Sequence, residues 1–194
     1  MRQFKQMRIT DHPIEAAFTN RWSPRAMNGA ALSQDEIMRL FEAARWAPSS
    51  GNSQPWRFVF ALAGTPHFER LLNLLVDANR AWCVKAGALI VALSKKTGDS
   101  GGPMPTHSFD AGAAWMSLAL QGSAMGLVTH GMAGFDYARA RVDLAVPDDF
   151  AVEAMVAVGH PGAVEDLPEK YRARETPSNR RPAAESVFEG VFPS

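Results

Sequence analysis

This 194-residue chain has a single cysteine, Cys83, which excludes an internal disulfide and a thiolate zinc cage. Its five histidines lack the spacing of a metal-binding motif, so we expect no metal centre. Lys+Arg and Asp+Glu both total 20, so no excess positive charge attracts nucleic acid. The chain also lacks an apolar run long enough to span a bilayer and a signal-peptide core in its first ten residues. We therefore expect a cytoplasmic protein that binds neither nucleic acid nor membranes.

Two nucleotide-binding patterns are missing as well. The sequence contains no G-x-G-x-x-G and no G-x-x-x-x-G-K-[ST], and it shows no regular alternation of strands and helices typical of a Rossmann sheet. A hydrophobic content of 46% with 21% charged residues is typical of a globular protein. The length predicts one domain over residues 1–194, in which about 163–194 form an extended, polar C-terminal arm. The apolar residues at its tip indicate that this arm docks on its own domain or on a partner.

Periodicity and capping signals predict helices alternating with short apolar strands. Ser33 and Glu36 form a capping-box pattern that starts the clearest helix, which Pro48 ends. The helix over 109–125 is long and rich in small residues, which favours a helix–helix seam between two copies. The remaining predicted elements are helices over 11–20, after Thr65 and after Asp136, strands over 57–62, 88–93 and 152–158, and a loop over 97–105.

The most informative stretch is Ala47–Trp56, a turn bounded by prolines that carries two hydroxyls, Ser49 and Ser50, and two carboxamides, Asn52 and Gln54. A carboxamide offers both donors and an acceptor. It therefore matches a ring edge that alternates C=O and N–H, such as the pyrimidine edge of a flavin. The alternative is a polar connection whose Asn, Ser and Gly residues only turn the chain.

Arginine pairs form the second group of candidates. The run from Arg21 to Arg25 brings two guanidinium groups together with Trp22 and Ser23, and Arg180–Arg181 forms a second pair. Guanidinium groups bind phosphate bidentately and stay charged at working pH. A phosphate monoester would suit such a site, although solvated basic turns have the same composition.

Three further positions can face a cofactor ring. The glycine-rich run 130–134 allows backbone N–H groups, including those of Ala133 and Gly134, to approach a flavin closely. Asn79 either caps a helix or offers one more carboxamide. No serine has a motif-like base partner and no carboxylate pair stands out. The chain therefore offers cofactor-binding chemistry without a catalytic set of its own, a pattern typical of enzymes whose cofactor performs the reaction.

In order and spacing, these segments resemble the FMN-dependent nitroreductase family. The carrying residues are Arg21-Trp22-Ser23-Pro24-Arg25, the run Glu42–Phe58, Gly126–Asp136, Gly159-His160-Pro161 and Arg180-Arg181-Pro182. The resemblance implies an α+β fold with a central antiparallel sheet flanked by helices. It also implies an intertwined homodimer with FMN at the interface, in which the arm packs on the partner.

The resemblance also implies the role of each candidate residue. Arg21, Ser23 and Arg180 or Arg181 would hold the FMN phosphate, with Arg25 near the pyrimidine end of the ring. Ser50, Asn52 and Gln54 would lie along the isoalloxazine, donated by the second subunit, while Asn79, Ala133 and Gly134 would face its edge and N5. NADH or NADPH would pass hydride to FMN, and a nitroaromatic, quinone, enone or similar small acceptor would then be reduced in a ping-pong cycle. Alternatives are a flavin oxidase that uses oxygen and a non-catalytic FMN-binding protein.

Overall fold

A four-stranded antiparallel sheet forms the centre of the computed structural model, which describes residues 8–98 and 100–193. Its strands follow the order β1-β2-β4-β3, and their bounds are β1 Trp56–Leu62, β2 Ala88–Lys95, β3 Val128–Met132 and β4 Phe150–Gly159. Every residue of β2 except the last is buried, as expected for a central strand covered on both faces. The predicted α+β class with a central antiparallel sheet is confirmed.

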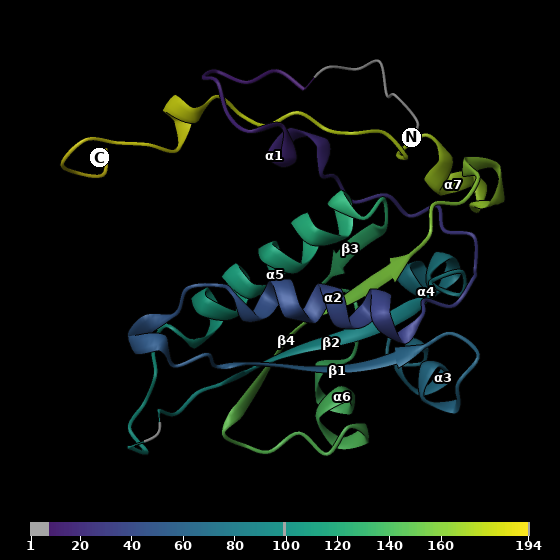
Figure 1. The fold of residues 1–194 in the computed structure, drawn as a ribbon, viewed down its shortest axis with the longest axis horizontal. Helices are drawn as coiled ribbons and strands as arrows, with labels where there is room; N and C mark the ends of the chain where they lie inside the picture. Colours follow the sequence, from purple (N-terminus) through teal and green to yellow (C-terminus); the bar gives the residue numbers. More distant parts are fainter. Residues whose placement is uncertain (1–7, 99, 194) are drawn as a thin grey trace.

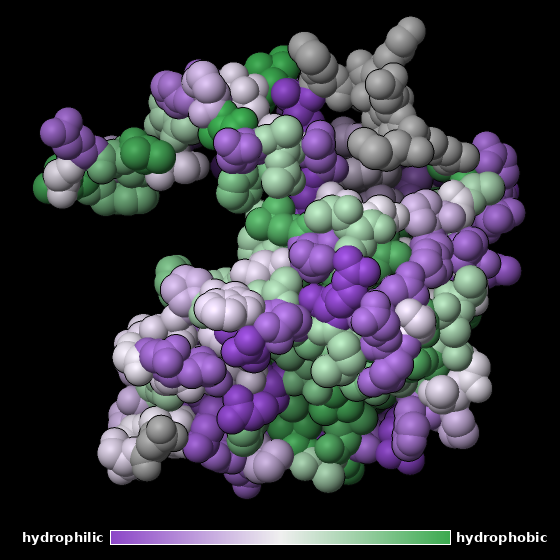
Figure 2. All heavy atoms as spheres, in the orientation of Figure 1, coloured by the Kyte–Doolittle hydropathy of each residue, from purple (hydrophilic) through white to green (hydrophobic). Residues whose placement is uncertain are grey.

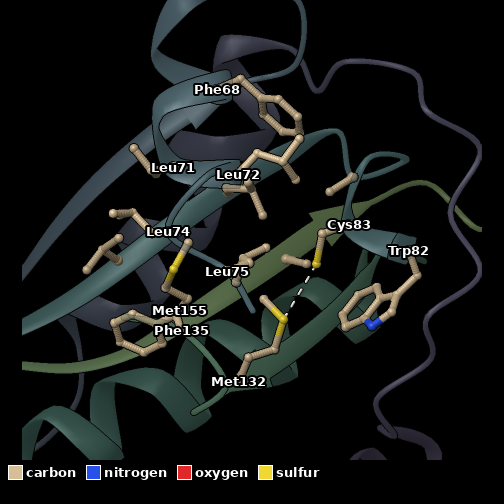
Figure 3. Close-up of a cluster of buried hydrophobic side chains, with 14 of the residues drawn as sticks. Phe68, Leu71, Leu72, Leu74, Leu75, Trp82, Cys83, Met132, Phe135 and Met155 are labelled. Carbon is tan, nitrogen blue, oxygen red and sulfur yellow. Dashed lines mark hydrogen bonds between the residues drawn. The ribbon is translucent and has the colours of Figure 1, made fainter. Parts of the chain in front are cut away.

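Helices cover both faces of the sheet (Figure 1). Alternate residues of β2 point to opposite faces, so Ile90 packs with Ile37 and Leu40 of α2 and with α5, whereas Leu89 and Val91 pack into the second cluster. Figure 3 shows that second cluster, which α3, α4 and the end of β3 supply with apolar side chains. The helices are α1 Ala16–Asn20, α2 Gln34–Arg45, α3 Pro66–Leu72, α4 Asp77–Cys83, α5 His107–Ala124, α6 Tyr137–Asp143 and α7 Glu169–Arg172.

Most predicted elements are present at the predicted places. The Ser33–Glu36 capping box is formed in full, and the Asp136 side chain accepts from the Arg139 N–H at 2.9 Å at the start of α6. The loop predicted over 97–105 lies between β2 and α5, with Asp99 outside the described residues. Local capping chemistry therefore sets these helix starts in the way the sequence indicates.

Three local predictions were wrong or incomplete. The first helix begins at Ala16, not at Asp11, because the Asp11 carboxylate accepts a hydrogen bond from the Ala183 N–H at 2.6 Å instead of capping a helix. Helix α4 was not predicted, and it contains Asn79 in its middle. Strand β3 was also not predicted: its sequence VTHGM is short and polar, and only its pairing with β4 makes it a strand.

The first described residues and the segment that follows α7 run side by side above the sheet (Figure 1). The extended arm predicted from about residue 163 begins only after α7, because Leu167 and Tyr171 pack into the hydrophobic core. Beyond α7 the described chain is extended apart from the short 3₁₀ turn Ala183–Glu185, and its last part stands away from the body (Figure 1). Figure 2 shows apolar side chains gathered at the tip of this arm, where Val191 and Phe192 are 80% and 83% exposed. None of the described helices has the length and apolarity needed to cross a membrane.

Candidate functional site

A polar cavity of about 290 Å³ lies between the segment that follows α1 and the start of the C-terminal arm. No carboxylate lines it, and among the described residues none of its arginines takes part in an ion pair. We call this cavity the arginine pocket, and its lining residues are Arg8, Arg21, Trp22, Ser23, Arg25, His130, Arg174, Thr176, Ser178 and Arg180. Five arginines in one cavity whose lining contains no carboxylate make it a candidate anion-binding site.

Arg21, which follows α1, is one of the residues that line the arginine pocket. Its Nη1 donates to Ser23 Oγ at 3.3 Å, and its backbone carbonyl accepts from Arg8 Nη1 at 2.7 Å. Burial and the charge of Arg180 lower the pKa of Arg21, although a guanidinium remains protonated in proteins. The buried Nε of Arg21 has no partner among the described residues. This orphaned donor fits a phosphate oxygen in the pocket.

A buried carboxylate, Glu175, fixes the backbone that carries Arg25. Its Oε1 accepts from the N–H groups of Arg25 and Ala26 at 2.7 and 2.8 Å, and the residue is only 4% exposed. Sequence reasoning missed this role because the partners are separated by 150 and 149 residues in the chain. The only signal in the sequence was an acidic residue within a basic segment.

One wall of the arginine pocket is aromatic: His130 of β3 lines the pocket, and the Trp82 ring of α4 lies against His130. The Trp82 and His130 ring centroids are 4.8 Å apart, and the Arg25 guanidinium lies 5.9 Å from the Trp82 ring centroid. His130 Nδ1 lies 2.8 Å from the Pro24 carbonyl oxygen, which can only accept, so Nδ1 carries the proton. Burial lowers the pKa of His130, which keeps the imidazole neutral at pH 7.

Asn79 and Gly134, both predicted from the sequence, meet next to this wall. Asn79 Nδ2 and the Val76 N–H donate to the Gly134 carbonyl at 3.0 and 3.1 Å. A Cβ added to Gly134 would lie 2.5 Å from Asn79 Nδ2, so a side chain at position 134 would displace the amide. The preceding Ala133 is exposed, and the two residues present open backbone at the end of β3.

The turn with Ser49, Ser50, Asn52 and Gln54 lies elsewhere, at the N-terminal end of α5. Asn52 and Gln54 adopt left-handed φ values of 56° and 46°. The Gln54 N–H donates to Ser49 Oγ at 3.0 Å, and Gln54 Nε2 donates to the Asn52 carbonyl at 2.9 Å. The buried Asp110 of α5 accepts from the Ser50 N–H at 3.2 Å, which ties the turn to the helix.

The fold therefore separates the predicted site residues into two groups within one chain. Ser49, Ser50, Asn52 and Gln54 line none of the arginine pocket, and Figure 1 places their turn and helix α4 at opposite ends of the sheet. Arg21, Trp22, Ser23, Arg25 and Arg180 line the pocket together. Arg181 lies outside it and instead lines a neighbouring cavity of about 490 Å³.

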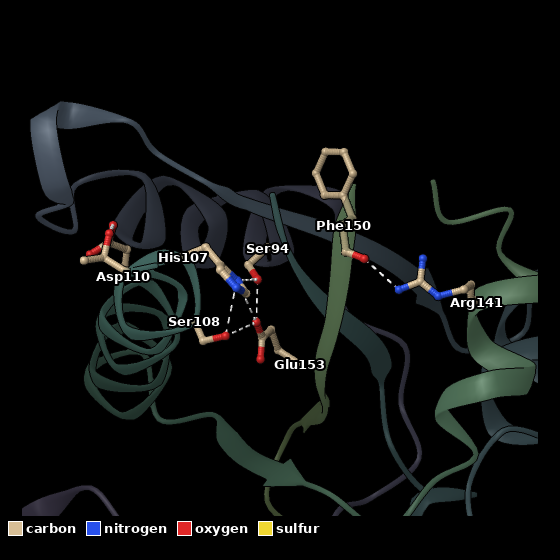
Figure 4. Close-up of polar contacts among 8 residues, drawn as sticks. Ser94, His107, Ser108, Asp110, Arg141, Phe150 and Glu153 are labelled. Atoms are coloured by element: carbon tan, nitrogen blue, oxygen red, sulfur yellow. Dashed lines mark hydrogen bonds and ion pairs between the residues drawn. The ribbon is translucent and has the colours of Figure 1, made fainter. Parts of the chain in front are cut away.

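A polar cluster that sequence reasoning missed fastens the first turn of α5 to the sheet (Figure 4). Glu153 Oε1 accepts from Ser108 Oγ at 2.6 Å and from Ser94 Oγ, and His107 Nδ1 lies 2.7 Å from Ser94 Oγ. The register shifts between Ala92 and Leu93, so Glu153 is the extra residue of a β-bulge. A bulge re-aims a side chain, here toward the helix that also holds the carboxamide turn.

The antiparallel sheet flanked by helices can be compared with the folds of known proteins. The model of the nitroreductase family matches residues 18–160, so the chain belongs to this family. A crystal structure described as an oxidoreductase containing FMN is 40% identical, with a TM-score of 0.92 over 96% of both chains.

Two further relatives are more distant. A structure from Desulfovibrio desulfuricans, described as a nitroreductase in complex with FMN, is 26% identical, with a TM-score of 0.70 over 95% of this chain and 100% of that one. An uncharacterized 15.4 kDa protein of Mycolicibacterium smegmatis is 33% identical over 120 residues, which cover 62% of this chain and 80% of that protein.

Proposed function

We propose that this protein is an FMN-dependent oxidoreductase that uses NADH or NADPH to reduce a small acceptor such as a nitroaromatic, a quinone or an enone. The observation that carries the proposal is the arginine pocket, which has five guanidinium groups and no carboxylate in its lining. An FMN phosphate, with nearly two negative charges, suits these donors. Relatives described as containing FMN support the same cofactor.

The chain's own residues would bind and orient FMN at two points. Arg21, Ser23 and Arg180 would hold the phosphate, while Asn79 and the backbone at Ala133 and Gly134 would face the ring edge. The absence of a side chain at position 134, where a Cβ would lie 2.5 Å from Asn79 Nδ2, leaves room for a close approach to that backbone. When bound, FMN supplies the acceptance of a hydride from a nicotinamide and its delivery to the acceptor.

A second copy of the chain would complete the site. Ser50, Asn52 and Gln54 cannot reach the arginine pocket of their own chain, since their turn lies at the opposite end of the sheet (Figure 1). Two aromatic residues beside the turn, Trp46 and Phe109, are 74% and 81% exposed, as expected for a surface that a partner covers. We therefore expect a homodimer in which each turn faces the partner's flavin, and in which the C-terminal arm packs on the partner.

Anaerobic spectroscopy of the purified protein tests this function. The proposal predicts a bound flavin whose oxidised absorbance disappears on addition of NADH or NADPH and returns on addition of a quinone or a nitroaromatic. A protein that binds no FMN would overturn it. A bound flavin that neither nucleotide reduces would instead indicate an oxidase that takes electrons from another donor, and reduction without turnover of any acceptor would indicate a binding protein.

A further inference from the structure

Two terminal segments of the chain lie side by side next to the arginine pocket: residues 8–12, the N-terminal segment, and residues 176–183, the C-terminal segment (Figure 1). The Ile9 N–H donates to Asn179 Oδ1 at 3.2 Å, and the Ala183 N–H donates to Asp11 Oδ2 at 2.6 Å. Both bonds are exposed, and a cavity of about 490 Å³ remains between the segments. Neither segment contributes to the two hydrophobic clusters. Their contact with each other therefore depends on little packing.

Each terminal segment contributes an arginine to the same cavity. Arg8 comes from the N-terminal segment and Arg180 from the C-terminal segment, and both line the arginine pocket with Arg21. Burial and the charges of Arg180 and Arg21 lower the pKa of Arg8. Like charges in one cavity repel, so bringing the two segments together is costly until an anion joins them.

Arg8 also connects the N-terminal segment to the predicted phosphate-binding run. Its Nη1 donates to the Thr19 and Arg21 carbonyl oxygens at 3.2 and 2.7 Å. Its Nε is buried and has no partner among the described residues. One end of this side chain thus positions the backbone of Arg21, and a further donor remains for a ligand in the pocket.

We propose that a phosphate dianion in the arginine pocket fastens the two terminal segments to each other, and that Arg8 is one of its ligands. The proposal rests on the proposed function for the identity of this dianion as the FMN phosphate; inorganic phosphate is the other source of the same chemistry. The phosphate would replace the repulsion between Arg8 and Arg180 with two charge-assisted contacts to one anion. Binding of the cofactor phosphate and association of the two terminal segments are therefore coupled.

Hydrogen exchange of the protein loaded with FMN, compared with the protein loaded with riboflavin, tests whether the phosphate fastens the two segments. Riboflavin is FMN without the phosphate. We expect amides in peptides that contain Ile9 and Ala183 to exchange more slowly, and together, with FMN than with riboflavin. Riboflavin with added inorganic phosphate should restore the protection if free phosphate suffices. Equal exchange with FMN and riboflavin at both segments would overturn the proposal.

Variants at position 8 test the charge and the reach of Arg8. Arg8→Gln removes the charge and, because its amide ends at the level of Arg Nε, also the two hydrogen bonds of Nη1, whereas Arg8→Lys keeps a charged donor on a long side chain. We expect Arg8→Gln to weaken FMN binding about tenfold or more while riboflavin affinity changes less than about twofold, with partial recovery in Arg8→Lys. Arg70→Ala, which removes an exposed charge on α3, is the matched control and should change neither affinity.

The outcomes also separate this proposal from the proposed function. If the protein binds FMN and is reduced by a nicotinamide, but Arg8→Gln binds FMN as tightly as the unaltered protein does, the role of Arg8 is refuted and the flavin function stands. If Arg8→Gln does not fold, the Arg8→Lys protein and the FMN-against-riboflavin exchange comparison still decide the question. A protein that binds neither flavin contradicts both proposals.

Discussion

Glu175 is the residue whose removal should most clearly disturb the arginine pocket without touching a ligand. It is 4% exposed, and its Oε1 accepts from two backbone N–H groups at 2.7 and 2.8 Å. A hydrogen bond to a charged group contributes about 1.5–3 kcal/mol, and a buried donor left unpaired costs about 1–3 kcal/mol. Because water can reach the half-buried Arg25 N–H, we expect Glu175→Ala to lower the free energy of unfolding by about 3 kcal/mol.

The matched variant is Glu175→Gln, which keeps an oxygen acceptor for both N–H groups but makes it neutral. Since neutral hydrogen bonds are about half as strong, we expect a loss of about 1–2 kcal/mol. Urea unfolding at fixed protomer and FMN concentrations gives both values, because ligand and partner concentrations otherwise shift the apparent stability. If Glu175→Ala stayed within about 0.5 kcal/mol of the unaltered protein, the claim that this carboxylate holds the Arg25 segment would be refuted.

Three further perturbations have expected outcomes. Gly134→Ala should displace the Asn79 amide, because the new Cβ would lie 2.5 Å from Nδ2. This change should weaken FMN binding, measured by flavin fluorescence. An unchanged FMN affinity would count against the proposal that Asn79 and Gly134 face the flavin ring. Burial lowers the pKa of His130 in the folded state below its unfolded value of about 6.5. The unfolded state therefore binds the proton at a higher pH than the folded state does. As a result, the free energy of unfolding should fall as the pH drops below about 6.5. A His130→Asn protein, which keeps an N–H donor, should show a flatter pH profile in urea titrations, and an equally steep one would contradict the assignment. Asp110→Asn should loosen the Ser50 turn and weaken FMN binding without abolishing the fold, as followed by flavin titration and circular dichroism; unaltered binding would show that the tie is dispensable.

Elements with local determinants could be predicted from the sequence alone. The capping box at Ser33 and the Asp136 cap set helix starts through contacts within a few residues, and the apolar run in β2 indicated a strand covered on both faces. The arginines from Arg21 to Arg25 were identified because guanidinium groups with a nearby hydroxyl favour phosphate wherever they occur. These signals lie within one short segment.

The missed features depend on contacts between distant segments. β3 is a strand because it pairs with β4. The Asp11 carboxylate accepts a hydrogen bond from an N–H group 172 residues away and therefore does not cap the predicted helix. The roles of Glu175 and Asp110 likewise arise from partners 150 and 60 residues away. Periodicity and motifs in the sequence do not indicate such distant pairings. The full set of residues around the arginine pocket could therefore be identified only from the structure.

The central claim is that each flavin site combines the arginine pocket of one chain with the carboxamide turn of another. Two variants each disrupt one part of this site. Arg21→Ala removes a phosphate donor from the arginine pocket. Asn52→Asp combined with Gln54→Glu replaces the carboxamide N–H donors of the turn by carboxylate oxygens of the same size. Each variant alone should bind FMN weakly as a homodimer. A heterodimer of the two would place both defects in one site and leave the other site intact.

The most direct test is therefore the FMN content of differently tagged, purified heterodimers. A shared site predicts that mixing the two defective chains restores tight binding of one FMN per heterodimer, about half the capacity of the unaltered dimer. No restored binding in the heterodimer, with both parent variants folded, would contradict a site built from two copies.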